Sequence, residues 1–271
     1  MSRIGRKAIA SGNPSIVSLE SLVSMSQTIG RLEEDQIILA EGNTSCRADE
    51  HTFFVKASGK SLCGCDAGAF VRVRFAPILE SLKRDRLEDE EVKALLEGSL
   101  AEPGPLLPSV ETFMHADLLS LPDVAFVGHC HATPLLSLLC LTDAKELAKK
   151  RLFPDEIVLC GPEAVWVDYC DPGFQLAKAI RSAVLAYIDR RGERPKTIWM
   201  RNHGLIVLGS NASEVESGMR MQVKAARVLL GAISSGREVT FLTDEQVERI
   251  HRRPDEHYRQ KLLWAQNGNQ A

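Results

Sequence analysis

Apolar residues recur at helical and strand spacings along most of the chain. Between residues 16 and 35 they follow a period close to 3.6, which predicts an amphipathic helix that packs by one face: Ile16, Leu19, Leu22, Val23 and Ile29. Residues 51–57 and 69–76 are short apolar runs typical of strands. The second run puts apolar and basic residues on opposite faces, with Val71, Val73 and Phe75 against Arg72 and Arg74. We expect that strand to be half buried.

The remaining pattern alternates helices with strands. It predicts helices over 79–98, 109–121, 133–141, 174–192 and 212–234, and strands over 124–132 and on both sides of a turn in 197–209. Ser109 is placed to cap the second of these helices and Thr133 the third. The first dozen residues lack periodicity, so we expect a loose arm and a fold that starts near Pro14. The class is α/β or α+β.

Residues 41–60, EGNTSCRADEHTFFVKASGK, have the pattern of an edge hairpin with a polar glycine turn at each end. A hairpin would bring these turns together, and with them Asn43, Ser45, Ser58 and Lys60. Glycine beside Asn or Ser is ordinary turn chemistry. The same turns could instead form an anion pocket, and the stretch alone leaves both interpretations open.

Composition narrows the class of protein. The 271 residues are 44% hydrophobic and 25% charged, as in an ordinary globular protein, and one large domain is expected. A net charge of -3 gives no global field for nucleic acid or an anionic membrane surface. No apolar run approaches the roughly 20 residues of a membrane span, and the start lacks a secretory signal, so we expect a cytoplasmic protein. The seven cysteines are expected to be reduced thiols.

The strongest chemical signal is GHCHA at residues 128–132. In a strand, His129 and His131 point to one side and Cys130 to the other. Two converging imidazoles suit a divalent transition metal, and a catalytic zinc site commonly has three protein ligands and an open position. His203, at a glycine turn between two apolar strands, is the candidate third ligand. His115 lies one helical turn after Glu111 and either steadies that carboxylate or simply packs.

Five ordered motifs resemble those of the class II aldolase/adducin family, which includes fuculose and rhamnulose phosphate aldolases: AEGNTSCR, VKASGKSL, PSVETFMHADLL, GHCHATPLLSL and MRNHGLIVLG. The resemblance covers residues 17–235. It implies a three-layer α/β/α fold with a central, mainly antiparallel sheet. Residues 1–271 would form one such domain with the N-terminal arm and a C-terminal helical tail. It also implies a homotetramer with each active site near a subunit boundary.

The resemblance also implies roles for single residues. His129, His131 and His203 would be the metal ligands, and Glu111 the catalytic acid/base and a fourth ligand in the resting enzyme. Asn43, Ser58, Gly59 and Ser109 would line a phosphate or carboxylate pocket, for which turn amides and a helix start are suited.

Two departures from the aldolase pattern weaken the expected phosphate pocket. Val110 stands where sugar-phosphate aldolases carry a second serine, and the second turn is ASG rather than PSG. The anion could therefore be a carboxylate. Alternatively, Lys60 or Arg47 compensates, although both are more simply solvated surface charges.

The implied function is a metal-dependent lyase that cleaves a small phosphorylated or carboxylated sugar or hydroxy-keto acid through a metal-stabilised enediolate. The metal is expected to be zinc, with cobalt or manganese as replacements. Glu111, with a pKa raised by a partly dry site, would move the proton. A dehydratase, epimerase or decarboxylase needs the same equipment. A hydrolase using metal-bound water and a non-catalytic adducin-like interaction module are further alternatives, and the histidines and glutamate argue against the last.

The C-terminal stretch 241–271 is polar but carries a late apolar cluster of Tyr258, Leu262, Leu263 and Trp264. We expect this tail to pack at a subunit interface.

Overall fold

A computed structural model describes residues 14–253 of the chain. Seven strands form a single sheet: β1 (Asn43–Arg47), β2 (Thr52–Lys56), β3 (Phe70–Arg74), β4 (Phe126–Cys130), β5 (Val165–Val167), β6 (Thr197–Met200) and β7 (Gly204–Gly209). Their order is β3-β2-β1-β4-β7-β6-β5, and every neighbouring pair is antiparallel except β5 with β6. The predicted mainly antiparallel sheet is confirmed.

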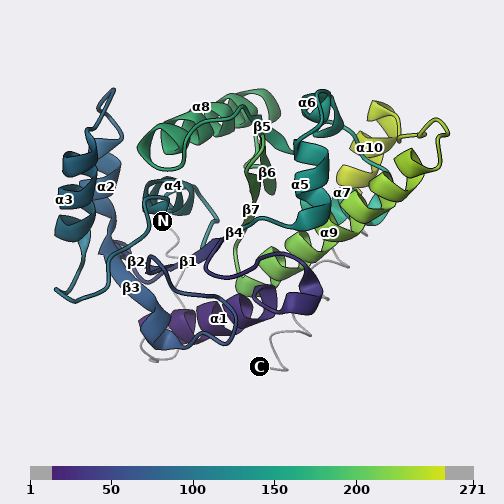
Figure 1. Ribbon diagram of the computed structural model, residues 1–271. Helices are drawn as coiled ribbons and strands as arrows, with labels where there is room; N and C mark the ends of the chain where they lie inside the picture. The colour runs from purple at the N-terminus through teal and green to yellow at the C-terminus, as the bar shows by residue number, and fades with distance from the viewer. Residues whose placement is uncertain (1–13, 254–271) are drawn as a thin grey trace, which may run out of the picture.

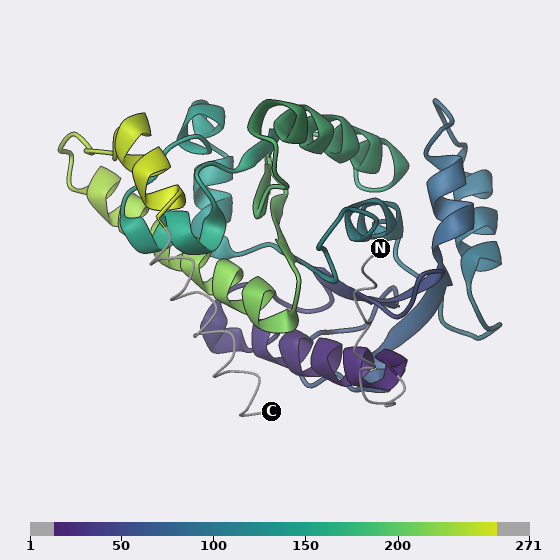
Figure 2. The ribbon, with the colours of Figure 1, turned by 180° about the vertical axis from the view of Figure 1, so that it is seen from behind.

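Helices cover both faces of this sheet, as Figures 1 and 2 show. The α-helices are α1 (Pro14–Ile29), α2 (Phe75–Ser81), α3 (Asp89–Ser99), α4 (Thr112–Leu119), α5 (Thr133–Leu139), α6 (Ala144–Leu147), α7 (Pro154–Cys160), α8 (Phe174–Arg191), α9 (Ala212–Ser234) and α10 (Asp244–His251). Two short 3-10 helices, η1 (Leu32–Glu34) and η2 (Ala67–Ala69), lie in connections.

The alternation of side chains along each strand divides the core in two. Val127 of β4 joins α4 and α8 on one face, where Phe113 and Phe174 meet edge to face. Phe126 and Cys130 of the same strand join α1, α5 and α9 on the other face. The three layers are thus helix, sheet and helix (Figure 1), and odd-numbered positions of β4 face α4.

Two predictions about elements are wrong. The helix expected over 79–98 is split into α2 and α3, because Glu88 and Glu91 form a capping box that starts a new helix. The hairpin of β1 and β2 is not at an edge, since β1 pairs with β4 and β2 with β3. Its register puts Asn43 directly opposite His129.

The two predicted caps also differ in detail. Helix α4 starts one residue after Glu111. The Ser109 hydroxyl accepts a hydrogen bond of 3.2 Å from the backbone amide of Glu111, so Ser109 caps the turn that precedes the helix. Thr133 is the first residue of α5, so the N-cap position falls to Ala132, whose side chain makes no capping bond.

No helix within residues 14–253 is long and apolar enough to cross a membrane. The seven cysteines all lie in this part of the chain, and no disulfide joins them. The expected N-terminal arm and the apolar tail cluster from Tyr258 to Trp264 lie outside the described residues.

Candidate functional site

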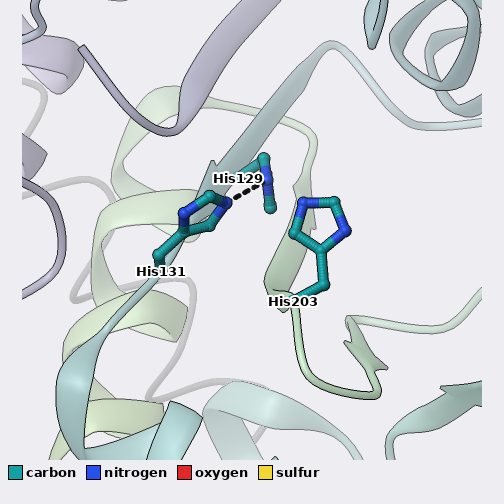
Figure 3. Close-up of side chains that lie close together, drawn as sticks. All are labelled: His129, His131 and His203. Atoms are coloured by element: carbon teal, nitrogen blue, oxygen red, sulfur yellow. Dashed lines mark hydrogen bonds between the residues drawn. The ribbon is translucent and has the colours of Figure 1, made fainter. Parts of the chain in front are cut away.

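His129 and His131 meet at one end of β4, as the strand alternation predicts. His129 is fully buried, on the side of the sheet that faces α4, and His131 follows the last strand residue. Their Nε2 atoms lie 3.0 Å apart (Figure 3), while Cys130 belongs to the core on the opposite face.

His203 completes a cluster of three imidazoles. It sits in the tight turn between β6 and β7, and its ring centroid lies 5.0 Å from that of His129 and 5.1 Å from that of His131. One nitrogen from each ring lies within 4.8 Å of the others, a grouping able to hold a metal ion. The next residue, Gly204, allows this approach, because a Cβ there would lie 2.9 Å from Cδ2 of His131.

Hydrogen bonds at the Nδ1 atoms show which ring nitrogens carry a proton and which have a free lone pair. Nδ1 of His129 lies 2.9 Å from the carbonyl oxygen of Leu205, which can only accept, so Nδ1 carries the proton. Nδ1 of His131 lies 3.0 Å from a carboxylate oxygen of Glu41 and donates to it. Burial lowers the pKa of His129 to about 3, so this ring is neutral at neutral pH and its Nε2 has a free lone pair.

The close approach of the two Nε2 atoms is explained by a proton or a metal ion between them. Two bare lone pairs 3.0 Å apart repel each other unless a proton or a metal ion lies between them. Two nitrogens bound to one tetrahedral zinc at about 2.0–2.1 Å would lie roughly 3.3 Å apart. The donor set and its spacing fit a divalent transition metal.

Glu111 points into the same cluster from the start of α4. Its Oε1 lies 3.2 Å from Nε2 of His203 and 3.7 Å from Nε2 of His129, is buried, and has no hydrogen-bond partner among the described residues. Oε2 accepts a hydrogen bond of 2.6 Å from the amide of Asn43. One carboxylate oxygen is thus anchored, and the other faces the three imidazoles.

The expectation of a raised pKa for Glu111 is wrong. Burial acts to raise this pKa, but the positive charges that His129 and His203 carry when protonated, together with the hydrogen bond from Asn43, outweigh it, and the pKa falls below its ordinary value. Glu111 is therefore ionised at neutral pH. It starts as a base and not as an acid.

A buried chain of hydrogen bonds orients the Asn43 amide. Since Asn43 Nδ2 donates to Glu111, its Oδ1 must accept, and it accepts from Nε2 of His115. Nδ1 of His115 is then bare and accepts from the Ser45 hydroxyl at 2.6 Å. Burial lowers the pKa of His115 to about 4, in keeping with a neutral ring.

The other expected anion-binding residues lie on two neighbouring segments of the chain. The Ser58 amide donates to the carbonyl of Leu107 at 2.9 Å, and Ala57 bridges to Pro108, so the turn of Ser58 and Gly59 lies beside Ser109. The Asn43 side chain is committed to Glu111 and His115, which leaves one amide hydrogen for a ligand.

Lys56 holds both polar turns together. This side chain is almost fully buried, and its ammonium group donates to the carbonyls of Ala40 at 2.6 Å and Lys60 at 2.7 Å. Burial lowers the pKa of Lys56 to about 8, although the negative charge of Glu111 acts in the opposite direction. A positive charge thus lies under the turns that were expected to bind an anion.

The two cations considered as compensation for Val110 differ in position. Arg47 is at the opposite end of β1 from Asn43, where it donates to the Leu119 carbonyl and lies over the Phe75 ring, so it cannot serve the pocket. Lys60 is exposed within the turn itself, and Val110 is 43% exposed beside Glu111.

Two residues of this site, Glu41 and Lys56, were missed as candidates in the sequence, and Ser45 was considered only for the anion pocket and not for the hydrogen-bond chain. Each lies within two residues of a motif position, so their neighbourhood was visible. Their contacts depend on strand register and on which nitrogen of the His131 ring faces away from the cluster. Residue spacing in the sequence predicts neither.

Comparison with known proteins gives a family match over most of the chain, the whole site included. The model of the family described as Class II Aldolase and Adducin N-terminal domain matches residues 21–230. A curated relative, the uncharacterized oxidoreductase YuxG of Bacillus subtilis (strain 168), is 29% identical over 204 residues, which are 72% of this chain. The match spans only 27% of that relative's length.

Solved structures share the fold. The N-terminal class II aldolase domain of a conserved protein from Thermoplasma acidophilum is 28% identical, with a TM-score of 0.63, and the match covers 85% of this chain and 99% of that one. YgbL from Klebsiella pneumoniae, described as a candidate aldolase, epimerase or decarboxylase, is 18% identical, with a TM-score of 0.66 over 88% of this chain and 100% of that one. L-fuculose 1-phosphate aldolase from Glaciozyma antarctica PI12 is 16% identical, with a TM-score of 0.63 over 91% and 85%.

Proposed function

We propose a metal-dependent carbon–carbon lyase activity for this chain, which belongs to the Class II Aldolase and Adducin N-terminal domain family. The substrate class is a small sugar phosphate or sugar acid with a hydroxyl group on the carbon β to a carbonyl. The observation that carries the proposal is the convergence of three imidazoles and one unpartnered Glu111 oxygen on one point.

His129, His131 and His203 are the residues that would hold a divalent ion, for which zinc is the first candidate and cobalt or manganese are replacements. When bound, this ion would polarise the substrate carbonyl and stabilise the negative charge left on it by carbon–carbon cleavage. Because the three imidazoles are neutral, they would leave the full positive charge of the ion available to polarise the carbonyl and stabilise that negative charge.

Glu111 is the residue we assign to proton transfer. In aldol cleavage, a substrate hydroxyl loses its proton and becomes a carbonyl, the adjacent carbon–carbon bond breaks, and the other fragment takes up a proton. An ionised carboxylate beside the cluster can accept one proton and return it. Asn43 holds Oε2, so Oε1 faces the reacting atoms.

The polar turns supply the remaining part of the site. Ser58, Gly59 and Ser109 offer hydroxyl and backbone groups to an anionic substrate end, and the Lys56 ammonium lies beneath them. The substrate named for the Glaciozyma antarctica enzyme has such an end, a phosphate.

A substrate screen tests this proposal. Metal-loaded protein is offered small ketose phosphates, sugar acids and hydroxy-keto acids, and the products are analysed for an aldehyde fragment. We expect cleavage of one class. Products formed by loss of water, inversion of a hydroxyl or release of carbon dioxide would instead indicate a dehydratase, epimerase or decarboxylase.

Glu111→Gln is the matched variant for that screen, since it is nearly isosteric and leaves the histidines in place. We expect turnover to fall at least roughly a hundredfold while metal content and fold are kept. Glu33→Gln, at an exposed position in η1, should behave as wild type. Turnover of Glu111→Gln within a few fold of wild type would remove Glu111 from the mechanism.

A further inference from the structure

Glu41 makes two hydrogen bonds that link a surface loop to the histidine cluster. One carboxylate oxygen, Oε2, accepts from Nδ1 of His131 at 3.0 Å. The other, Oε1, accepts from the backbone amide of Ile38 at 2.7 Å. The side chain is only 31% exposed, so water screens these contacts incompletely.

The His131 ring separates Glu41 from the centre of the cluster. Its Nε2 faces His129, and its Nδ1 faces Glu41, so the carboxylate lies behind the ring. Glu41 therefore cannot bind the ion that His131 Nε2 would bind. It is placed to act on that ion only through the ring.

The segment from Gln36 to Gly42, which carries Glu41, is held by two hydrogen bonds and packs closely against the end of β4. The Lys56 ammonium donates to the Ala40 carbonyl at 2.6 Å, and the His131 amide donates to the Gln36 carbonyl at 3.0 Å. Gly42 has a φ of 65°, and a Cβ there would lie 2.8 Å from the His129 carbonyl oxygen. An ordered loop thus holds the Glu41 carboxylate next to the His131 ring.

We propose that Glu41 is a positioning residue for the metal ligand His131, an inference that rests on the proposed metal site. Its carboxylate holds the proton on Nδ1 and thereby keeps the Nε2 lone pair directed at the cluster. It also raises the basicity of the ring, because a charged acceptor stabilises the positive charge that builds up on a ligating imidazole. His129 has only a neutral carbonyl in the same place.

Metal affinity in a chelator competition tests this role. We compare wild type with Glu41→Ala, Glu41→Gln and the exposed control Glu33→Ala, using zinc and cobalt separately. Loss of the hydrogen-bond partner of a metal-ligating histidine typically lowers metal affinity 10- to 100-fold, and we expect a loss of about that size for Glu41→Ala. Glu41→Gln keeps an oxygen acceptor but loses the charge, so its affinity should lie between those of Glu41→Ala and wild type. Glu33→Ala should match wild type.

The outcomes separate this inference from the function it rests on. If wild type binds no transition metal, the proposed metal site itself is wrong. If wild type binds metal and Glu41→Ala binds equally well, the site stands and the role of Glu41 is overturned. A thermal melt of each metal-free variant shows whether a loss of affinity comes with a loss of fold. Equal losses in Glu41→Ala and Glu41→Gln, with melting unchanged, would contradict the rescue expected from the remaining acceptor.

Discussion

The Asn43 amide, from a distant part of the sequence, connects the proton-transfer candidate Glu111 with the buried ring of His115, one helical turn further on. Each partner in the chain from Ser45 to Glu111 can play only one role once Glu111 is ionised. His115 therefore steadies Glu111, as one reading of its spacing suggested, but it does so through Asn43 and not directly.

We expect His115→Phe to lower turnover roughly ten- to a hundredfold while metal content is kept. Phenylalanine fills the space of the ring but cannot donate, so the Asn43 amide is free to turn and Glu111 loses its fixed orientation. Steady-state kinetics with metal analysis measure this. Ser45→Ala, which removes only the far end of the chain, should have a smaller effect. Equal turnover of His115→Phe and wild type would show that the ring only fills space.

The residue types of the metal site could be predicted from the sequence, and their partners could not. His129 and His131 follow from strand alternation, because a period of two is a property of every strand. The link of Asn43 to Glu111 depends on β1 lying next to β4 with Asn43 opposite His129. Strand register depends on tertiary packing, which the sequence pattern does not show. The hairpin pattern instead predicted a position at the edge of the sheet.

At the scale of elements, the turn between β6 and β7 places His203 against the end of β4. Gly204 makes this possible, because a Cβ there would collide with the Cys130 carbonyl oxygen and lie 2.9 Å from the His131 ring. The strands would have to separate to admit one methyl group.

We therefore expect Gly204→Ala to destabilise the fold by about 1–3 kcal/mol and to weaken metal binding. Gly231, inside α9, is the matched control, since a Cβ there meets nothing within 4 Å. Gly231→Ala should stabilise by roughly 0.5–1 kcal/mol and leave metal binding alone. Denaturant unfolding with a chelator competition measures both. A Gly204→Ala protein as stable as wild type would mean that the strands yield easily.

Long periodic elements were predicted well, and the shortest ones, β5 and α6, were missed. α8 and α9 span 18 and 23 residues, so their apolar period is repeated over several turns. β5 has three residues and α6 has four, which is too few to show a period. The split between α2 and α3 comes from a local capping box inside a charged stretch.

At the scale of the whole molecule, the C-terminal tail carries the prediction of a subunit interface. Part of that stretch is described: in α10, Val247 and Ile250 pack on Ile157 and Val158 of α7. Removing residues 241–271 would uncover these side chains, so a shorter deletion is cleaner.

Deleting residues 254–271 leaves α10 in place and removes the apolar cluster of the tail. If the tail packs at an interface of a homotetramer, light scattering should show a smaller mass for the truncated protein than for the full chain. An unchanged mass, with unchanged activity, would remove the tail from the interface and leave the metal site untouched.

A metal ion held by the three histidines is central to the proposed function. The most direct measurement is the metal content per chain after loading and dialysis, for wild type, His129→Ala and the exposed control His51→Ala. We predict about one zinc per chain in wild type and in His51→Ala, and a large loss in His129→Ala. A wild-type protein without bound transition metal, or a His129→Ala protein that holds as much as wild type, would contradict the account.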